Sequence, residues 1–534
     1  VSYPVLFLSG GCTPAAAGAS PHHPIHPEVG FHPLRTGLKT MAETFLNYIA
    51  GRWVAARSGR TFANLNPANG AHLGDFPSSG PDDVNDAVAA AAGAFRAWRL
   101  TPAPKRAEII FRAGEIIRAR KEELARAMTR EMGKILVEAR GDVQEGIDMA
   151  YLAAGEGRRM YGVTTPSEMP DKWAMSVRAP IGVVGVITPW NFPFAIPSWK
   201  LMPALVAGNA AVFKPAGDTP EMAWHFTRIF AEAGLPPGVL NLVFGSGSQV
   251  GNPMVEHPGI HVISFTGSTE VGLQIAGRGG ALGKRISLEM GGKNAIIVME
   301  DADLALATDA IVWSAFGTTG QRCTACSRVL VHEAVHDDLV QRVAARAKQL
   351  RLGDGLEAAT DVGPLVNAKQ VETVARYVAI GVQEGGTLVA GGEPAREGAL
   401  ARGHFYQPTV FAAVRPDARI AVEEIFGPVL AMVKVKGLEE AVAVNNASRY
   451  GLSSAIFTAD VNRAFTAMRD LETGIVYVNH GTTGAETHLP FGGTRDTGNG
   501  HREAGHTMLD PFTEWKSIYV DFSGRLQRAQ IDNA

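Results

Sequence analysis

Apolar residues recur along the chain with two periods, first that of helices and then that of buried strands. From Asp83 to Trp98 and from Arg106 to Met132 they return every three or four positions, which is typical of amphipathic helices. The first continuous β-branched run is 181–190, as expected for a strand buried on both faces. Three similar runs follow after helix-compatible stretches: 210–216, 239–245 and 261–267. This alternation predicts a doubly wound parallel sheet.

A second series of apolar runs begins after Gly291 and Gly292. It comprises the segments 294–299, 328–333, 386–392, 429–435 and 474–480. Two successive α/β units predict two domains, with ligands bound in the cleft between them at the carboxyl ends of strands. Residues 156–179 and the strand 515–522 fit neither unit. We hypothesise that the strand 515–522 pairs with a partner subunit or with a protruding hairpin.

Length and composition are those of a globular protein with several domains. The chain has 534 residues, 46% of them hydrophobic and 19% charged. A formal net charge of −3 argues against a nucleic-acid-binding protein. No apolar run is long enough to predict a membrane-spanning helix. Residues 1–44 are predicted to be a disordered tail, because Pro, His, Gly and Ala follow one another there without periodicity.

The three cysteines are Cys12, Cys323 and Cys326. So few cysteines do not make a disulfide framework, and a reducing cytoplasm is expected. The spacing Cys323-x-x-Cys326 formally matches a redox pair or half of a zinc site. A second pair of ligands at suitable spacing is missing, so no metal site is predicted. We interpret Cys326 as a packing residue.

A thiol and a carboxylate stand in two glycine-rich stretches, Cys323 in FGTTGQRCTACSR and Glu289 in ISLEMGGK. Thiolate is the nucleophilic form of cysteine, and a free thiol with a pKa of about 8.5 needs help to reach it at neutral pH. Flanking glycines let the backbone approach a substrate and offer N–H groups to an oxyanion. The pair is therefore suited to forming and hydrolysing an acyl intermediate. The alternative is that Cys323 is simply a small buried residue.

Other segments contain residues that are suited to binding a nucleotide. Where the strand 261–267 runs into a helix start, Gly267 and Ser268 can bind a pyrophosphate and Thr269 or Ser268 can cap the helix, although an ordinary turn would look alike. Lys214 ends a buried strand, from which it can reach ribose hydroxyls. Glu424 precedes a Phe-Gly-Pro turn that can aim it at a second ribose. For both charged residues, an exposed surface position is the alternative.

Seven motifs together resemble those of the aldehyde dehydrogenase superfamily, and most closely its semialdehyde dehydrogenase-like branch. They occur in the order and spacing of that family, over about residues 45–522. The motifs are Pro189-Trp190-Asn191-Phe192-Pro193, Phe213-Lys214-Pro215, Phe265-Thr266-Gly267-Ser268, Leu288-Glu289-Met290-Gly291-Gly292-Lys293, Gly320-Gln321-Arg322-Cys323, Glu424-Ile425-Phe426-Gly427-Pro428 and Pro490-Phe491-Gly492-Gly493.

The resemblance implies the catalytic roles. Cys323 is the nucleophile that attacks the aldehyde carbon, and the Asn191 amide with the Cys323 N–H is the oxyanion hole. Glu289 is the general base that activates water on the resulting thioester. Glu503 matches a carboxylate sometimes proposed as a proton relay. The implied NAD or NADP contacts are Lys214 on the adenosine ribose, Gly267 and Ser268 on the pyrophosphate, Glu424 on the nicotinamide ribose, and Trp190 and Phe426 as apolar walls.

The resemblance also implies an α/β fold in three parts. These are a Rossmann-like NAD(P)-binding domain, an α/β catalytic domain and a small β oligomerisation arm. Their expected ranges are 45–155 with 180–290, 291–493, and 156–179 with 508–522. A homodimer or homotetramer acting on a small-molecule aldehyde is implied, with neither nucleic acid nor membrane as partner.

One departure bears on the cofactor, and one retained residue bears on the product. Many NAD-preferring members carry a Glu where this chain has Gly217, followed by Asp218. We therefore expect dual or weakly selective use of NAD and NADP. Members that transfer the acyl group to coenzyme A commonly lack the base at Glu289, so hydrolysis to the free acid is expected.

The substrate follows only from the surroundings of the motifs. They look most like those of enzymes acting on semialdehydes with a carboxylate or amino-acid end. Arg322, His480 and His488 could face an anionic tail, because Arg forms bidentate pairs with carboxylates. Surface or oligomer contacts are the alternative.

Two other functions stay open at this point. A catalytically silent relative could serve as a structural or binding protein, but such a relative should have lost Cys323 or Asn191. A cysteine hydrolase without a dinucleotide would need a histidine base. The nearest candidate, His332, follows Cys323 by nine residues inside a predicted strand.

Overall fold

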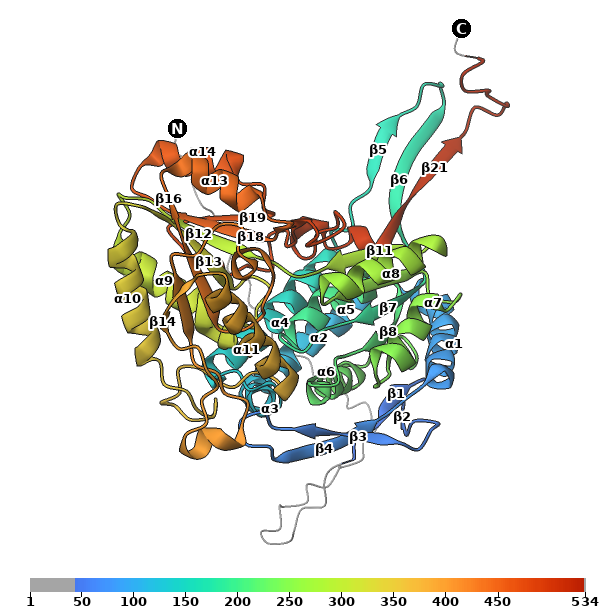
Figure 1. The fold of residues 1–534 in the computed structure, drawn as a ribbon. Coiled ribbons are helices and arrows are strands. Elements are labelled where there is room, and N and C mark those ends of the chain that lie inside the picture. The colour runs from blue at the N-terminus through green and yellow to red at the C-terminus, as the bar shows by residue number, and fades with distance from the viewer. Residues whose placement is uncertain (1–43, 533–534) are drawn as a thin grey trace, which may run out of the picture. The chain divides into compact units, whose positions relative to one another are not determined.

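Two mainly parallel sheets organise the computed structural model, which describes residues 44–532 (Figure 1). The predicted tail, residues 1–44, lies outside the described residues except for Thr44. The first sheet has the strand order β11-β10-β7-β8-β9-β1-β2. Its strands are β1 (Asn47–Ile49), β2 (Arg52–Val54), β7 (Val183–Ile187), β8 (Ala210–Lys214), β9 (Leu240–Leu242), β10 (Val262–Thr266) and β11 (Arg285–Glu289).

The four strands predicted for this sheet are confirmed as β7, β8, β9 and β10. The pattern missed β11, because RISLE alternates polar and apolar residues although four of its five residues are buried. It also missed the antiparallel edge strands β1 and β2, which are three residues each. The sheet is therefore parallel in its centre and antiparallel at one edge.

Helices cover both faces of the first sheet, as a doubly wound fold requires. Alternate residues of β7 show this: Val184 and Val186 pack with one set of helices, and Val183 and Ile187 with the other. The first set is α2 (Ala103–Ala119), α3 (Lys121–Met132), α4 (Leu136–Glu156), α5 (Ala195–Ala207) and α6 (Pro220–Glu232). The second set is α1 (Pro81–Trp98), α7 (Asn252–Glu256) and α8 (Thr269–Ala281). The single helical stretch predicted at 106–132 is two helices that meet at Arg120.

The second sheet has the order β14-β15-β16-β13-β12-β18-β19. Its strands are β12 (Asn294–Val298), β13 (Cys326–His332), β14 (Thr387–Ala390), β15 (Thr409–Ala412), β16 (Val429–Val435), β18 (Ser453–Phe457) and β19 (Ile475–Val478). On one face lie α9 (Leu304–Phe316) and α10 (His336–Gln349), and on the other α11 (Ala368–Gln383), α12 (Arg419–Val422), α13 (Leu438–Asn446) and α14 (Val461–Asp470). Five strands were predicted, and the short β15 and β18 were not.

A third sheet is separate from the other two and has the order β21-β6-β5. It contains β5 (Val163–Pro166), β6 (Lys172–Pro180) and β21 (Thr513–Asp521), and Figure 1 shows it projecting beside β11. All nine residues of β21 pair antiparallel with β6. The last strand therefore pairs with a protruding hairpin of its own chain, one of the two alternatives expected. Smaller two-stranded sheets are β3 (Thr61–Leu65) with β4 (His72–Pro77) and β17 (Tyr450–Gly451) with β20 (Thr494–Arg495).

No helix of residues 44–532 is long and apolar enough to cross a membrane. The fold α/β with parallel sheets is the one expected from the sequence.

Close packing of α4 on α5 fixes the wall of the site described below. A Cβ atom at Gly146 of α4 would stand 2.6 Å from the Phe194 ring, whereas at Gly141, one turn earlier, it would meet nothing within 4 Å. Because the buried Phe194 ring has no room to move, we expect Gly146→Ala to destabilise the protein by about 1–3 kcal/mol. The control Gly141→Ala should be neutral or stabilise by up to about 1 kcal/mol. Calorimetric melting of both variants measures this, and equal melting temperatures would contradict the packing argument.

Candidate active site

The predicted site residues come from opposite ends of the strands in the two sheets. The parallel strands β7, β8, β10 and β11 run in one direction, so their carboxyl ends share one edge. From that edge come Asn191, Lys214, Ser268 and Glu289. Cys323 instead precedes the amino end of β13, as Glu424 precedes that of β16. The expectation that ligand groups lie at carboxyl ends is therefore right for the first sheet and wrong for the second.

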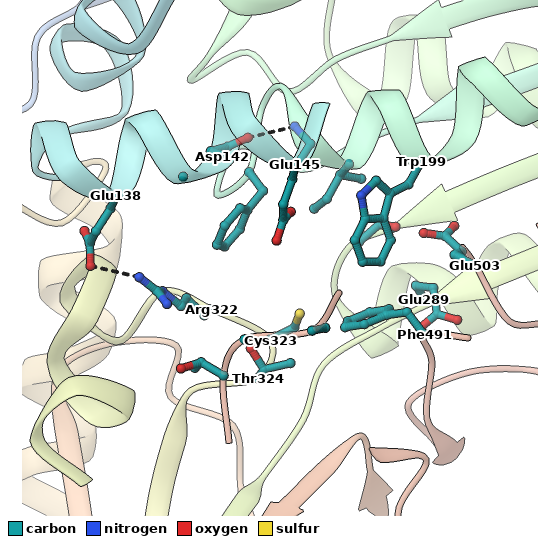
Figure 2. Close-up of a pocket in the computed structure, with 18 of the residues that line it drawn as sticks. Glu138, Asp142, Glu145, Trp199, Glu289, Arg322, Cys323, Thr324, Phe491 and Glu503 are labelled. Atoms are coloured by element: carbon teal, nitrogen blue, oxygen red, sulfur yellow. Dashed lines mark hydrogen bonds and ion pairs between the residues drawn. The ribbon is translucent and has the colours of Figure 1, made fainter. Parts of the chain in front are cut away.

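A cavity of about 290 Å³ joins these two edges (Figure 2). Cys323 and Glu289 both line it, together with Thr266 at the end of β10. Figure 2 shows Glu289, Glu503 and Phe491 together on one side of the cavity and Glu138 with Arg322 on the other. Its aromatic lining consists of Phe192, Trp199, Trp313 and Phe491. The sequence-predicted thiol and carboxylate therefore share one largely apolar cavity.

The half-buried Cys323 sits in a firmly held loop. Burial and, after it, the charges of Glu289 and Glu424 raise the pKa of its thiol to about 12, and the N–H groups of Thr324 and Cys323 oppose the rise. The Asn294 side chain donates hydrogen bonds to the carbonyl oxygens of Cys323 (2.7 Å) and Ala325 (2.9 Å). These bonds fix the backbone from Cys323 to Ala325.

Cys326 has a different environment. Its side chain is 1% exposed and its Sγ donates to the Arg328 carbonyl oxygen at 3.3 Å. Neither Cys323 nor Cys326 is in a disulfide. The interpretation of Cys326 as a packing residue is confirmed, since it lies in the core between β13 and α9.

Glu289 is a buried carboxyl group without a hydrogen-bond partner among the described residues. Burial raises its pKa well above the usual range, and the nearby charge of Glu503 adds to this, while Lys200 and Arg502 oppose it. A Cβ atom at Gly492 would stand 2.6 Å from Glu289 Oε1, so only glycine leaves the carboxyl group its place. Its surroundings thus favour the neutral form of Glu289.

Glu503 lies beside Glu289 and has a partner of its own. Its Oε1 forms an ion pair with the fully buried Lys200 Nζ, which also donates to Ser264 Oγ at 3.2 Å. The backbone of Glu503 exchanges two hydrogen bonds with Phe491, of 2.7 and 2.8 Å. Glu503 therefore lines the cavity in a fixed position, next to the carboxyl group predicted to be the base.

Asn191 lies in the loop between β7 and α5 and is 3% exposed. The next residue, Phe192, lines the cavity and has the Lys134 ammonium 3.9 Å from its ring centroid. Lys134 forms a fully buried ion pair of 2.9 Å with Asp142, and Asp142 accepts a 2.7 Å hydrogen bond from the Ala195 N–H. This buried network ties the Asn191 loop to α4. The contact of Asn191 with a substrate oxyanion stays a prediction.

Three residues predicted to contact the adenosine half of a dinucleotide lie at the carboxyl edge of the first sheet. Lys214 is buried at the end of β8, where Nζ donates to the Pro215 carbonyl oxygen at 2.7 Å and burial lowers its pKa to about 8. Ser268 caps α8 by accepting from the Val271 N–H at 3.4 Å, as predicted. Gly267 has the Phe265 ring 2.4 Å from the place of a Cβ atom, so no side chain fits there.

The groups predicted for the nicotinamide half are also close together. Glu424 Oε1 accepts from the Gly292 N–H at 3.0 Å, and burial raises its pKa to about 7. A Cβ atom at Gly291 would stand 2.2 Å from Glu424 Oε2, so the glycine pair forms a cradle for this carboxyl group. The rings of Trp190 and Phe426 meet edge to face at 5.5 Å. A cation, helix N–H groups and a cradled carboxyl group fit the phosphates and riboses of a dinucleotide.

Of the cations expected to face an anionic tail, only Arg322 lines the cavity. Its guanidinium pairs with Glu138 at 2.9 Å and lies 5.1 Å from the Trp313 ring centroid. His480 instead stacks on Tyr477, and His488 is exposed beside Glu486.

The sequence analysis missed an acidic face on α4. Glu138, Asp142 and Glu145 all line the cavity. Their spacing of four and three residues puts them on one helix face, a signal readable from the sequence. Acidic side chains on a helix are usually solvated, so the pattern alone did not indicate a site.

The histidine needed by a cysteine hydrolase is not placed for that role. His332 is the last residue of β13, while Cys323 precedes its first residue. The first and last residues of this strand are six residue steps apart, which is a distance of about 20 Å. His332 Nε2 lies 3.6 Å from Glu300 instead.

Comparisons with known proteins agree with this geometry. The model of the aldehyde dehydrogenase family matches residues 53–518. The alpha-ketoglutaric semialdehyde dehydrogenase of Bacillus subtilis (strain 168) is 41% identical over 482 residues, 90% of this chain and 99% of that protein. The structure of betaine aldehyde dehydrogenase from Staphylococcus aureus in complex with NAD+ has a TM-score of 0.88 and 32% identity, covering 90% of this chain and 95% of its own. An E. coli NADP dependent enzyme has a TM-score of 0.87 and 35% identity, covering 90% and 98%.

Fold and cavity define an α/β enzyme that brings a thiol and a carboxylate together beside the carboxyl edge of the first sheet. The chain belongs to the aldehyde dehydrogenase family. It is an oxidoreductase that acts on an aldehyde group with NAD(P), and no observation supports the silent-relative alternative.

Proposed function

We propose that this enzyme oxidises a small semialdehyde with an anionic end, of the α-ketoglutarate semialdehyde class, to the dicarboxylic acid. The observation that carries the proposal is the single cavity lined by both Cys323 and Glu289. Similarity to the Bacillus subtilis enzyme supports the substrate class. Arg322 on the cavity wall supports an anionic end, because its guanidinium has more N–H donors than its bonds to Thr318 and Glu138 use.

The residues divide the reaction into two halves. The Cys323 thiolate adds to the aldehyde carbon, and the oxyanion of the thiohemiacetal accepts hydrogen bonds from the Asn191 amide and the Cys323 N–H. NAD(P)+, when bound, supplies the acceptor for the hydride that leaves this carbon. Glu289 then takes a proton from the water that attacks the thioester, which releases the acid and restores the Cys323 thiolate.

The burial of Glu289 determines the pH range in which it can act as a base. A base must be ionised, and burial holds this carboxyl group in its acid form up to an unusually high pH. The hydrolytic half-reaction should therefore accelerate as pH rises through the raised pKa. The neighbouring ion pair of Glu503 and Lys200 is placed to receive the proton.

Replacing Glu289 by Gln should separate the two halves. The amide keeps the shape but cannot accept a proton, so we expect the steady-state rate to fall by about 100- to 10,000-fold. An initial burst of about one reduced nucleotide per active site should persist, because thioester formation does not need the base. Stopped-flow absorbance measures both phases, and Cys323→Ala, which forms no thioester, is the control without a burst. A Glu289→Gln enzyme with unchanged turnover would contradict this assignment.

We propose that both NAD and NADP are used, bound by Lys214, Gly267, Ser268, Glu424, Trp190 and Phe426. A Cβ atom at Gly217 would have the Phe62 ring 3.8 Å away as its nearest neighbour, so no carboxylate fills this space. Asp218 cannot replace it freely, because its Oδ1 accepts from Asn367 Nδ2 at 2.9 Å. The NAD+ complex and the NADP-dependent enzyme among the structural neighbours support the range of cofactors.

Gly217→Glu should increase the selectivity of the enzyme for NAD over NADP. A carboxylate there would repel a 2′-phosphate, so we expect the ratio of kcat/KM for NAD over NADP to rise by about tenfold or more. Gly217→Ala, which adds no charge, should leave the ratio near that of the parent. Steady-state kinetics with both nucleotides measure it, and a parental preference for NAD above about 100-fold would refute dual use.

The same proposal covers the organisation of the chain. Residues 45–155 and 180–290 serve as the NAD(P)-binding domain and 291–493 as the catalytic domain, in a cytoplasmic enzyme. The arm of β5, β6 and β21 serves a homodimer or homotetramer. Large apolar side chains exposed on the arm support this: Val163, Trp173, Val177, Trp515, Tyr519 and Val520.

Charged residues on the arm should therefore dissociate the oligomer. We expect the double variant Trp515→Glu with Tyr519→Glu to lower the molar mass measured by light scattering, because both side chains are more than half exposed. Leu100→Glu alters a side chain that is 72% exposed next to α1, away from the arm, and is the matched control. An arm variant with the parental molar mass would exclude this role of the arm.

A further inference from the structure

Three carboxyl groups of α4 line the cavity, and only two of them have a partner. Glu138 pairs with Arg322 at 2.9 Å and Asp142 with Lys134 at 2.9 Å. Among residues 44–532, the third, Glu145, makes neither an ion pair nor a hydrogen bond with another side chain. The partnered charges cancel in pairs. The half-buried Glu145 is therefore the surplus acid of this wall.

Glu145 is directed at the place where a substrate must lie. Figure 2 shows the Glu145 side chain pointing from α4 into the cavity, towards Cys323. The sulfur of Cys323 points into the cavity from the other side. The two residues belong to opposite walls, the helix α4 and the loop before β13. When the aldehyde carbon is held at Cys323, the rest of the substrate therefore extends towards the α4 wall.

We propose that Glu145 binds the end of the substrate opposite the aldehyde, donating a hydrogen bond from its acid form to an oxygen atom of a carboxylate or keto group there. The proposal rests on the proposed function and deepens its substrate class. An ionised Glu145 would repel such an end and attract a cationic one instead. The protonation state of one side chain then selects the charge of the substrate.

The surroundings of Glu145 favour its acid form. Burial raises its pKa to about 8, and the charge of Asp142 adds to this. Because the pKa is raised, the acid form dominates below about pH 8 and is lost as pH rises above it. The groups that face Glu145 are Asp142 and Asp148 on its own helix, Lys134 before it, Arg322 from the loop before β13 and Tyr477 from β19.

The test compares kcat/KM for three aldehydes of fixed charge between pH 7 and 9. They are α-ketoglutarate semialdehyde as the anion, butanal as the neutral and betaine aldehyde as the cation. The ratio of anion to neutral cancels the titration of Cys323 and Glu289, which both substrates share. This ratio should fall about tenfold from pH 7 to 9, as the acid form of Glu145 is depleted, and the ratio of cation to neutral should rise.

Two variants isolate the group responsible. Glu145→Gln keeps a hydrogen-bond donor but cannot titrate, so both ratios should become independent of pH. Asp148→Asn, at an exposed position of α4, removes the weakest of the charges that raise the Glu145 pKa, so the fall should persist at a slightly lower pH. A parental ratio that does not change with pH, or a fall that persists in Glu145→Gln, would overturn the proposal. If no aldehyde reduces either nucleotide, the proposed function itself fails, which is a different result.

Discussion

The chain crosses between its two sheets at one point, and the site depends on that crossing. Glu289 is the last residue of β11 and Asn294 the first residue of β12, so only four residues separate the two sheets. The carboxyl edge of the first sheet is thereby held against the amino edge of the second. The Asn294 side chain also donates hydrogen bonds to the carbonyl oxygens of Cys323 and Ala325. One short connection thus positions the base and the nucleophile together.

Glycine is required in this connection because other groups occupy the space. The carboxyl group of Glu424 lies where a Cβ atom of Gly291 would be, and the Cys323 carbonyl oxygen lies 2.6 Å from that of Gly292. The N–H of Gly292 in turn donates to Glu424. Backbone from the crossing therefore touches both the predicted cofactor carboxylate and the nucleophile loop. Larger residues here would displace the Glu424 carboxyl group and the Cys323 loop.

Loss of hydration is the second constraint, and it acts on several ionisable groups near the cavity. Burial raises the pKa of Cys323, Glu289 and Glu424 and lowers that of Lys293 to about 7. Groups of both signs are thus driven towards their neutral forms. Lys134 and Asp142, by contrast, form a fully buried ion pair of 2.9 Å. Removing one partner of such a buried pair typically costs about 3–5 kcal/mol, so this pair also holds α4 in place.

Much of this could be predicted from the sequence, because buried parallel strands and short motifs are local signals. Four strands of the first sheet and five of the second follow from apolar runs, and Ser268 caps its helix as its position indicates. The strand β11 was missed because its burial comes from packing in the sheet, not from its alternating residues. The pairing of β21 with β6 joins segments more than 300 residues apart, and only its alternatives could be named.

The role of α4 shows why the rest of the site needs three dimensions. The spacing of Glu138, Asp142 and Glu145 fixes a common helix face, but whether that face meets solvent or a cavity depends on α5 and on the loop of Cys323. Ion-pair partners also determine which of the three carboxyl groups stays available to a ligand. Arg322 and Lys134 neutralise two of the three acids, and neither pairing follows from distance in sequence. A charged pattern becomes a specificity element only when the fold leaves one charge without a partner and points it at the reacting group.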